Sequence, residues 1–125
     1  MRTWSVPKAK VVFYKEKEQV YFLEWMKTVP AKAQTKCYLF LDRLKENGHE
    51  LRRPMADLLR DGIYELRPSL QGIHYRILYF FSGKDFVVVS HGITKESAVP
   101  AVEIDRAIER KQKFELNPSK HTFGS

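Results

Sequence analysis

Residues 62–81 read GIYELRPSLQGIHYRILYFF, and this stretch decides the fold. In its first part, Tyr64 and Leu66 alternate with Glu65 and Arg67, which is the two-residue period of a half-buried strand. The same period continues over 73–81, and the turn-forming residues SGKD then lead to a third run, FVVVSH, at 86–91. Three consecutive strands joined by short connections indicate antiparallel neighbours.

Helical periodicity appears on both sides of this strand region. A short β-branched and aromatic run at 11–14 comes first and is predicted to be a strand. Two amphipathic helices are expected next, the second between Pro30 and the stop signal Asn47-Gly48, and a third begins at Pro100. Their apolar stripes are Phe22, Trp25, Met26 and Val29; Ala33, Cys37, Phe40, Leu41 and Leu44; and Ala101, Ile104, Ala107 and Ile108.

This order of elements predicts a single α+β domain over residues 1–117, followed by a loose tail at 118–125. The two N-terminal helices must bury their stripes, and the only large partner is one face of a mainly antiparallel sheet. The other face should therefore stay partly open. We expect the functional residues on that open face.

Composition narrows the function classes. The 125 residues include 22 Lys and Arg against 15 Asp and Glu, a net charge of +7 that suits an anionic partner such as nucleic acid but also fits an ordinary basic protein. Cys37 is the single cysteine and is expected in the core, not as a reactive thiol. No disulfide, multi-cysteine metal site or helical His ligand spacing is present, so no metal or cofactor is expected. The longest apolar run, 77–81, is far shorter than the roughly 18 residues of a membrane span, so no membrane partner is expected. The single cysteine favours a reducing, cytoplasmic setting.

Charged side chains gather on the strand face that points away from the N-terminal helices. Glu65 and Arg67 come from one strand, and His74 and Arg76 come from the next. These residues either pair across a solvated sheet face or form a phosphate-binding surface. Leu78 and Phe80 share this face and either stack on nucleobases or lie under the third helix. His91, next to a glycine at the end of the last strand, is either a structural histidine or an acid or base.

Four short motifs in this order resemble the RelE/ParE toxin superfamily, and within it the HigB-like branch that includes phage-derived proteins. They are GIYELR at 62–67, YRILYF at 75–80, VVSHG at 88–92 followed by Lys95, and Pro100 with Glu103-Ile104. The resemblance covers about residues 9–115. It implies a RelE-like fold and a toxin of a type II toxin–antitoxin system, neutralised by a helix-turn-helix antitoxin. It also implies an endoribonuclease that cuts mRNA on the ribosome and so inhibits translation.

The resemblance implies roles for individual residues. By position, Arg67 and Arg76 would act at the scissile phosphate, and Lys95 matches a basic segment of the family. Arginine stays charged and meets two phosphate oxygens, so Arg76 suits charge neutralisation and Arg67 suits a clamp, which leaves His91 as the candidate acid or base. Glu65 stands where RelE itself tends to carry a positive charge. The expected RNA-binding residues are Arg52, Arg53, His74 and Phe80.

Two other functions stay open at this point. One is a non-nucleolytic toxin that inhibits a protein such as DNA gyrase, as ParE-type relatives do. The other is a catalytically weak, toxin-like protein whose basic sheet serves only to bind an antitoxin.

Overall fold

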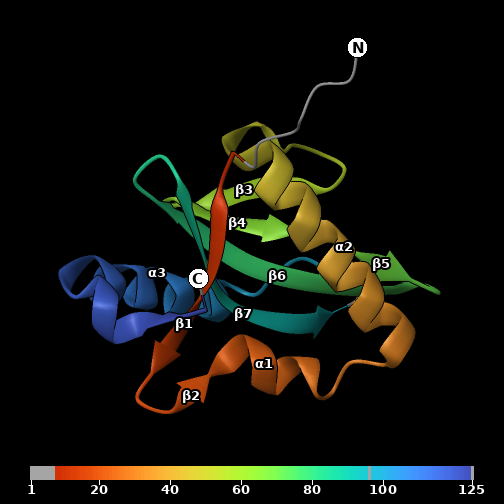
Figure 1. Cartoon of the computed structure of the whole chain (residues 1–125). Helices are drawn as coiled ribbons and strands as arrows, with labels where there is room; N and C mark the ends of the chain where they lie inside the picture. The colour runs from red at the N-terminus through yellow and green to blue at the C-terminus, as the bar shows by residue number, and fades with distance from the viewer. Residues whose placement is uncertain (1–7, 96, 125) are drawn as a thin grey trace.

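A computed structural model describes residues 8–95 and 97–124 of the chain. In these residues, eight strands form one sheet, and three α-helices and two short 3-10 helices surround it (Figure 1). No helix in the described ranges is long and apolar enough to cross a bilayer. In chain order the elements are β1 (Lys10–Glu16), β2 (Gln19–Val20), α1 (Tyr21–Met26), α2 (Ala31–Asn47), η1 (Gly48–Glu50), β3 (Ala56–Arg60), β4 (Ile63–Leu66), β5 (Ser69–Leu70), β6 (Ile73–Ser82), β7 (Phe86–Lys95), α3 (Ala101–Leu116), η2 (Pro118–His121) and β8 (Thr122–Phe123).

The sheet follows the order β2-β1-β7-β6-β4-β3, with β5 also paired to β6 and β8 to β1. The antiparallel pairs β4–β6 and β6–β7 confirm the three consecutive strands predicted from the two-residue period. β1 pairs in parallel with β7, from Lys10 opposite Phe86 to Phe13 opposite Val89. The first strand of the chain therefore lies inside the sheet and not at its edge.

One face of the sheet packs against α1 and α2, as the sequence predicts. Phe22 and Met26 of α1 and Cys37 of α2 are buried in the same cluster as Ile77 and Tyr79 of β6. α2 begins directly after Pro30, where a fixed φ suits a helix start, and ends before Gly48, whose φ of 54° lies in the left-handed region. Figure 1 shows α2 across this face of the sheet.

The opposite face packs against α3 around Leu78 and Phe80 and stays partly open at Arg67, whose side chain is 24% exposed. Leu78 and Phe80 are fully buried there, beside Ala107 and Phe114 of α3. The Phe80 ring is 0% exposed and meets the Phe114 ring edge-on at 5.9 Å between centroids. Phe80 is therefore a core residue, and its predicted role in RNA binding is wrong because a buried ring has no free face for a base.

The C-terminal segment is also more ordered in the fold than the sequence suggests. Residues 118–125 are predicted to be a loose tail, but η2 and β8 occupy 118–123. Thr122 and Phe123 pair with Tyr14 and Phe13 of β1, and His121 is buried with its ring stacked on Tyr14 at 5.0 Å. This pairing completes the edge of β1 that does not face β7.

Candidate functional site

Two arginines and one carboxylate meet at the end of β4, and we call this group of Glu65, Arg67 and Arg76 the Glu65 cluster. Leu66 pairs with Ile77, so the next residue, Arg67, follows the strand toward Arg76. Nη1 of Arg67 donates a hydrogen bond of 2.8 Å to Oε2 of Glu65. Oε1 of the same carboxylate lies 3.6 Å from Nε of Arg76. The two guanidinium groups thus converge on one carboxylate.

Burial differs sharply within the Glu65 cluster. Glu65 and Arg76 are only 4% and 6% exposed, whereas the side chain of Arg67 is 24% exposed. Among the described residues, Nε and Nη1 of Arg76 are buried without a hydrogen-bond partner. The cluster holds two cations and one anion, and a buried cation that lacks a full partner is costly. Its excess positive charge suits an anion that approaches from the side of Arg67.

A second ion pair borders this cluster on β3. Asp57 stands opposite Glu65 in the sheet register, and its Oδ2 lies 2.8 Å from Nη2 of Arg53. The pKa of Asp57 is lowered, first by the hydrogen bond from Arg53 and to a small extent by the charge of Arg67. Arg53 therefore lies on the β3 side of the Glu65 cluster, and its role in RNA binding stays a prediction.

Three other predicted site residues, Arg52, His74 and Lys95, are not members of the Glu65 cluster. Arg52 donates through Nη1 to the carbonyl oxygens of His49 and Leu51, so it is tied to the backbone around η1. His74 is half-buried on β6, on the same face as Arg76, and stands opposite Lys95. Lys95 is the last residue of β7 and not a loop residue, and its side chain lies outside the described part of the chain.

His91 lies in the middle of β7, whereas the sequence places it at a strand end. Leu78 of β6 pairs with His91, but the next residue, Tyr79, pairs with Val89. Ser90 is therefore the extra residue of a β-bulge, a feature that re-aims side chains. Both Ser90 and His91 hydrogen-bond to Arg110 of α3.

Both ring nitrogens of His91 are engaged. Nε2 lies 2.9 Å from Oε1 of Glu103, and Nδ1 lies 3.0 Å from Nη1 of Arg110 and 2.7 Å from Oγ of Ser90. Burial, with the nearby charge of Arg110, lowers the pKa of His91 to about 4 against the opposing effect of Glu103. The ring is thus neutral at pH 7, with Nε2–H donating to Glu103 and Nδ1 accepting from Arg110. A role as acid or base would require one of these partners to move.

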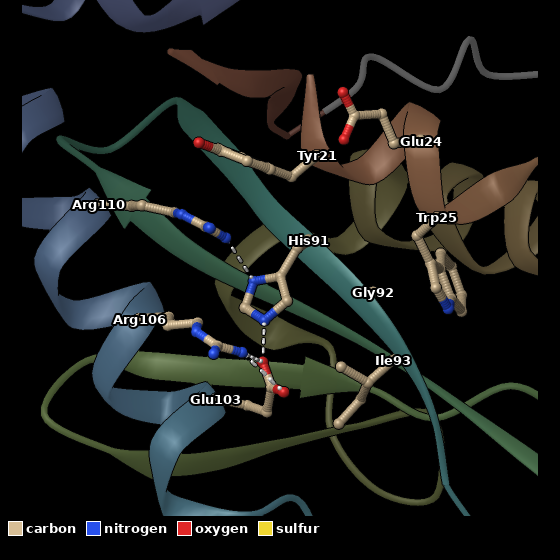
Figure 2. Close-up of a pocket in the computed structure, with 9 residues that line it drawn as sticks. All are labelled: Tyr21, Glu24, Trp25, His91, Gly92, Ile93, Glu103, Arg106 and Arg110. Carbon is tan, nitrogen blue, oxygen red and sulfur yellow. Dashed lines mark hydrogen bonds and ion pairs between the residues drawn. The ribbon is translucent and has the colours of Figure 1, made fainter. Parts of the chain in front are cut away.

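An open pocket of about 400 Å³ lies beside this histidine, between α1, the free edge of β7 and α3. β7 has no β1 partner beyond Val89, and α1 lies against this edge instead. Figure 2 shows Arg106 and Arg110 reaching in from α3, with Trp25 on the far wall. The lining residues are Tyr21, Glu24, Trp25, His91, Gly92, Ile93, Glu103, Arg106 and Arg110.

Close packing fixes the walls of this pocket. The Trp25 indole sits against Gly92, where an added Cβ would lie only 2.1 Å from Cε3 of the ring. Nε1 of Trp25 donates a hydrogen bond of 3.2 Å to Oγ1 of Thr94. On the other wall, the Arg110 guanidinium stacks 3.9 Å above the centroid of the Tyr21 ring, a cation–π contact.

Apart from His91, the residues of this second polar group are not predicted from the sequence. A signal was present, because Glu103, Arg106 and Arg110 follow one another at the three- and four-residue spacing of a single helix face. Nothing in the sequence indicates the β-bulge that turns His91 toward them. Glu65 is predicted on the charged strand face, but no catalytic or binding role follows for it from the sequence.

One comparison with known proteins gives a match. The family model for phage derived protein Gp49-like (DUF891) matches residues 24–112, which is most of the chain. The matched span contains both the Glu65 cluster and the residues that line the pocket, except Tyr21. No curated protein matches the chain.

Proposed function

The chain belongs to the Gp49-like family of phage-derived proteins, which is associated with RelE/ParE-like toxins of toxin–antitoxin systems, and from this membership we propose that it is a type II toxin that cleaves mRNA on the ribosome. Its partners would be a helix-turn-helix antitoxin, the ribosome and mRNA. The observation that carries the proposal is the Glu65 cluster, in which two arginines from neighbouring strand segments share one carboxylate.

The chemistry needs three groups and no metal ion. A ribose 2′-hydroxyl attacks the neighbouring phosphorus, the bond from phosphorus to the 5′-oxygen breaks, and the product carries a 2′,3′-cyclic phosphate. The 2′-hydroxyl must lose a proton, the pentavalent phosphorus must be stabilised, and the 5′-oxygen must gain a proton. Each task can be assigned to a residue in or beside the Glu65 cluster.

Glu65 is the group that can accept the proton of the 2′-hydroxyl. Its Oε2 atom is the oxygen that the partly exposed Arg67 contacts, so the 2′-hydroxyl would reach the buried carboxylate from the side of Arg67. Arg67 is the more exposed arginine and would contact the phosphate oxygens through its planar fork. Arg76 is buried, so its contribution would be electrostatic, a fixed positive charge behind the reacting phosphate.

His74 is the candidate that protonates the leaving 5′-oxygen. It lies two residues before Arg76 on the same face of β6 and is half-buried. His91 is less suited to this task because both of its ring nitrogens are already bonded. Lys95, which the family resemblance places among the catalytic residues, stands opposite His74 in the sheet register and keeps that predicted role. The ribosome would supply the substrate positioning that a protein of 125 residues lacks.

Transcript-end mapping after induction in cells tests the proposal. Arg67→Gln and Glu65→Gln should each remove the cuts and relieve growth arrest, whereas both variants should keep antitoxin binding. Arg43→Gln is the matched control, because Arg43 is an exposed helix residue that pairs with Glu46 of the same helix. If growth arrest persists in the Arg67 variant without any cuts, the nuclease proposal is wrong.

One observation favours a second candidate, a toxin-like protein that only binds an antitoxin. The Glu65 carboxylate already occupies Nη1 of Arg67, so a phosphate has to compete with it. Under this hypothesis the wild-type chain binds its antitoxin but causes neither transcript cuts nor growth arrest. A ParE-like toxin would give a third result, namely DNA breaks with intact transcripts.

A further inference from the structure

We infer that the pocket between α1, β7 and α3 binds one nucleotide of single-stranded RNA next to the cleaved bond, with its phosphate held by Arg106 and Arg110. This inference rests on the proposed function and extends its substrate contact to a second place on the surface. It assigns a ligand to a group of residues that has no part in the Glu65 cluster.

Arg110 is a half-buried cation whose nearby acidic charge comes from Glu16, a carboxylate that is itself paired with Lys113. Its guanidinium bonds to Nδ1 of His91 and Oγ of Ser90 through Nη1 alone and stacks on the Tyr21 ring. Within residues 8–95 and 97–124 it forms no ion pair. Burial lowers its pKa, which reflects the cost of holding this charge away from water. An incoming phosphate would offset that cost.

Arg106 lies one helical turn before Arg110 and points into the same pocket (Figure 2). Its side chain is 55% exposed, and its ion pair with Glu103 uses Nη1. Two arginines one turn apart can bind the oxygens of one phosphate. The indole of Trp25 lines the same pocket, and nucleobases stack on such rings without strong sequence preference. A volume of about 400 Å³ falls in the range of small-ligand pockets.

The position of the pocket matches the path of a bound strand. Ile93 lines the pocket and stands opposite Arg76 in the β6–β7 register, on the α3 side of the sheet. Adjacent strands lie roughly 4.8 Å apart. An RNA strand whose phosphate meets the Glu65 cluster therefore reaches the pocket by crossing only β7.

The charge of Glu24 should weaken the binding of a phosphate in the pocket, and this direction can be tested. This exposed carboxylate lies on the α1 side of the pocket, and Glu103 is already paired with His91 and Arg106. A phosphate in the pocket is repelled by Glu24. A basic side chain from a protein partner would instead be attracted by it, so removal of this charge separates the two occupants.

The experiment measures binding of a fluorescent, fully 2′-O-methylated RNA oligomer to the full-length chain by anisotropy at several salt concentrations. The methyl groups remove the nucleophile, so binding is measured without cleavage. Arg106→Gln should weaken binding by about fivefold and reduce the slope of log affinity against log salt by about 0.7, the loss of one phosphate contact. Glu24→Gln should tighten binding by about twofold. Arg43→Gln is the control for net charge, because Arg43 also pairs with a glutamate three residues away.

The outcomes distinguish this inference from the proposed function. Equal effects of Arg106→Gln and Arg43→Gln on affinity and salt slope would overturn the inference, and so would absence of any binding by the wild-type chain. If Glu24→Gln and Arg106→Gln change antitoxin affinity and leave RNA affinity unchanged, the pocket is a protein interface and the inference is wrong. Transcripts that stay intact while the pocket variants behave as expected would refute only the nuclease. If the transcript cuts depend on Arg67 but the pocket variants do not change RNA binding, only the inference about the pocket is wrong.

Discussion

The contact between Gly92 and Trp25 leads to a sharp prediction about stability. Alanine at position 92 places its Cβ 2.1 Å from Cε3 and 2.4 Å from Cδ2 and Cζ3 of the Trp25 indole. The φ of Gly92 is not among the positive values of the chain, so the backbone itself accepts an L-residue. The whole cost of Gly92→Ala therefore comes from the clash with the indole.

The size of that cost follows from the displacement. Carbon atoms in contact lie about 3.5–4.0 Å apart, so the indole must move by roughly 1.5 Å. Overpacking of this kind costs about 1–3 kcal/mol, and a broken Trp25–Thr94 hydrogen bond adds about 1 kcal/mol. We expect Gly92→Ala to lower the free energy of unfolding by about 2–4 kcal/mol.

A double-mutant cycle with Trp25→Ala isolates the cause. Without the indole, Gly92→Ala should cost less than about 0.5 kcal/mol, because alanine also restricts the unfolded chain. Urea unfolding of the four proteins, followed by far-UV circular dichroism, gives the required free energies. If Gly92→Ala costs the same with and without Trp25, the clash is not the reason for glycine at this position.

Three other predictions concern buried side chains. As the pH falls from about 7 to about 4, protonation of His91 should reduce the free energy of unfolding by up to about 3 kcal/mol. The reason is that the imidazole of the unfolded chain binds a proton near pH 6.5, whereas that of the folded chain binds one only near pH 4. Unfolding free energies of the wild type and His91→Gln should therefore diverge over this pH range, and parallel curves would contradict the prediction. Cys37 is fully buried and burial raises its pKa to about 11, so a thiol reagent should modify it only after unfolding; rapid labelling of the folded protein would disprove its core position. Phe80→Ala should lower the free energy of unfolding by about 3–5 kcal/mol, measured by urea titration; a loss below about 1 kcal/mol would show that the ring is not packed under α3.

Local periodicity predicts most elements of this fold correctly. The two-residue alternation in 63–67 and 73–81 predicts β4 and β6, because polar and apolar side chains must face opposite sides of a strand. The three- and four-residue spacing of apolar side chains predicts α2 and α3, and prolines mark both starts. These signals lie within a few residues of chain and need no knowledge of the neighbours.

Local periodicity does not predict strands that form only through pairing with distant segments. β3 (ADLLR) follows a proline and has no clear alternation, so it is a strand only because β4 pairs with it. β8 is two residues long and exists through its pairing with β1. Likewise, β7 extends beyond His91 because β6 is long enough to pair with it up to Lys95.

For the candidate site, the sequence by itself determined that Glu65 and Arg67 share one side of their strand and that His74 and Arg76 share one side of the next, since alternation in a strand is a local property. The β4–β6 register places both pairs on the same face of the sheet. Only the tertiary structure decided that α3 packs over Leu78 and Phe80 on that face. It also decided that Arg76 is buried against Glu65, and that a β-bulge joins His91 to Glu103 and Arg110. The physical reason is the range of the interactions. A backbone period fixes which way a side chain points, but burial and the partners of a charge depend on segments that return from far along the chain.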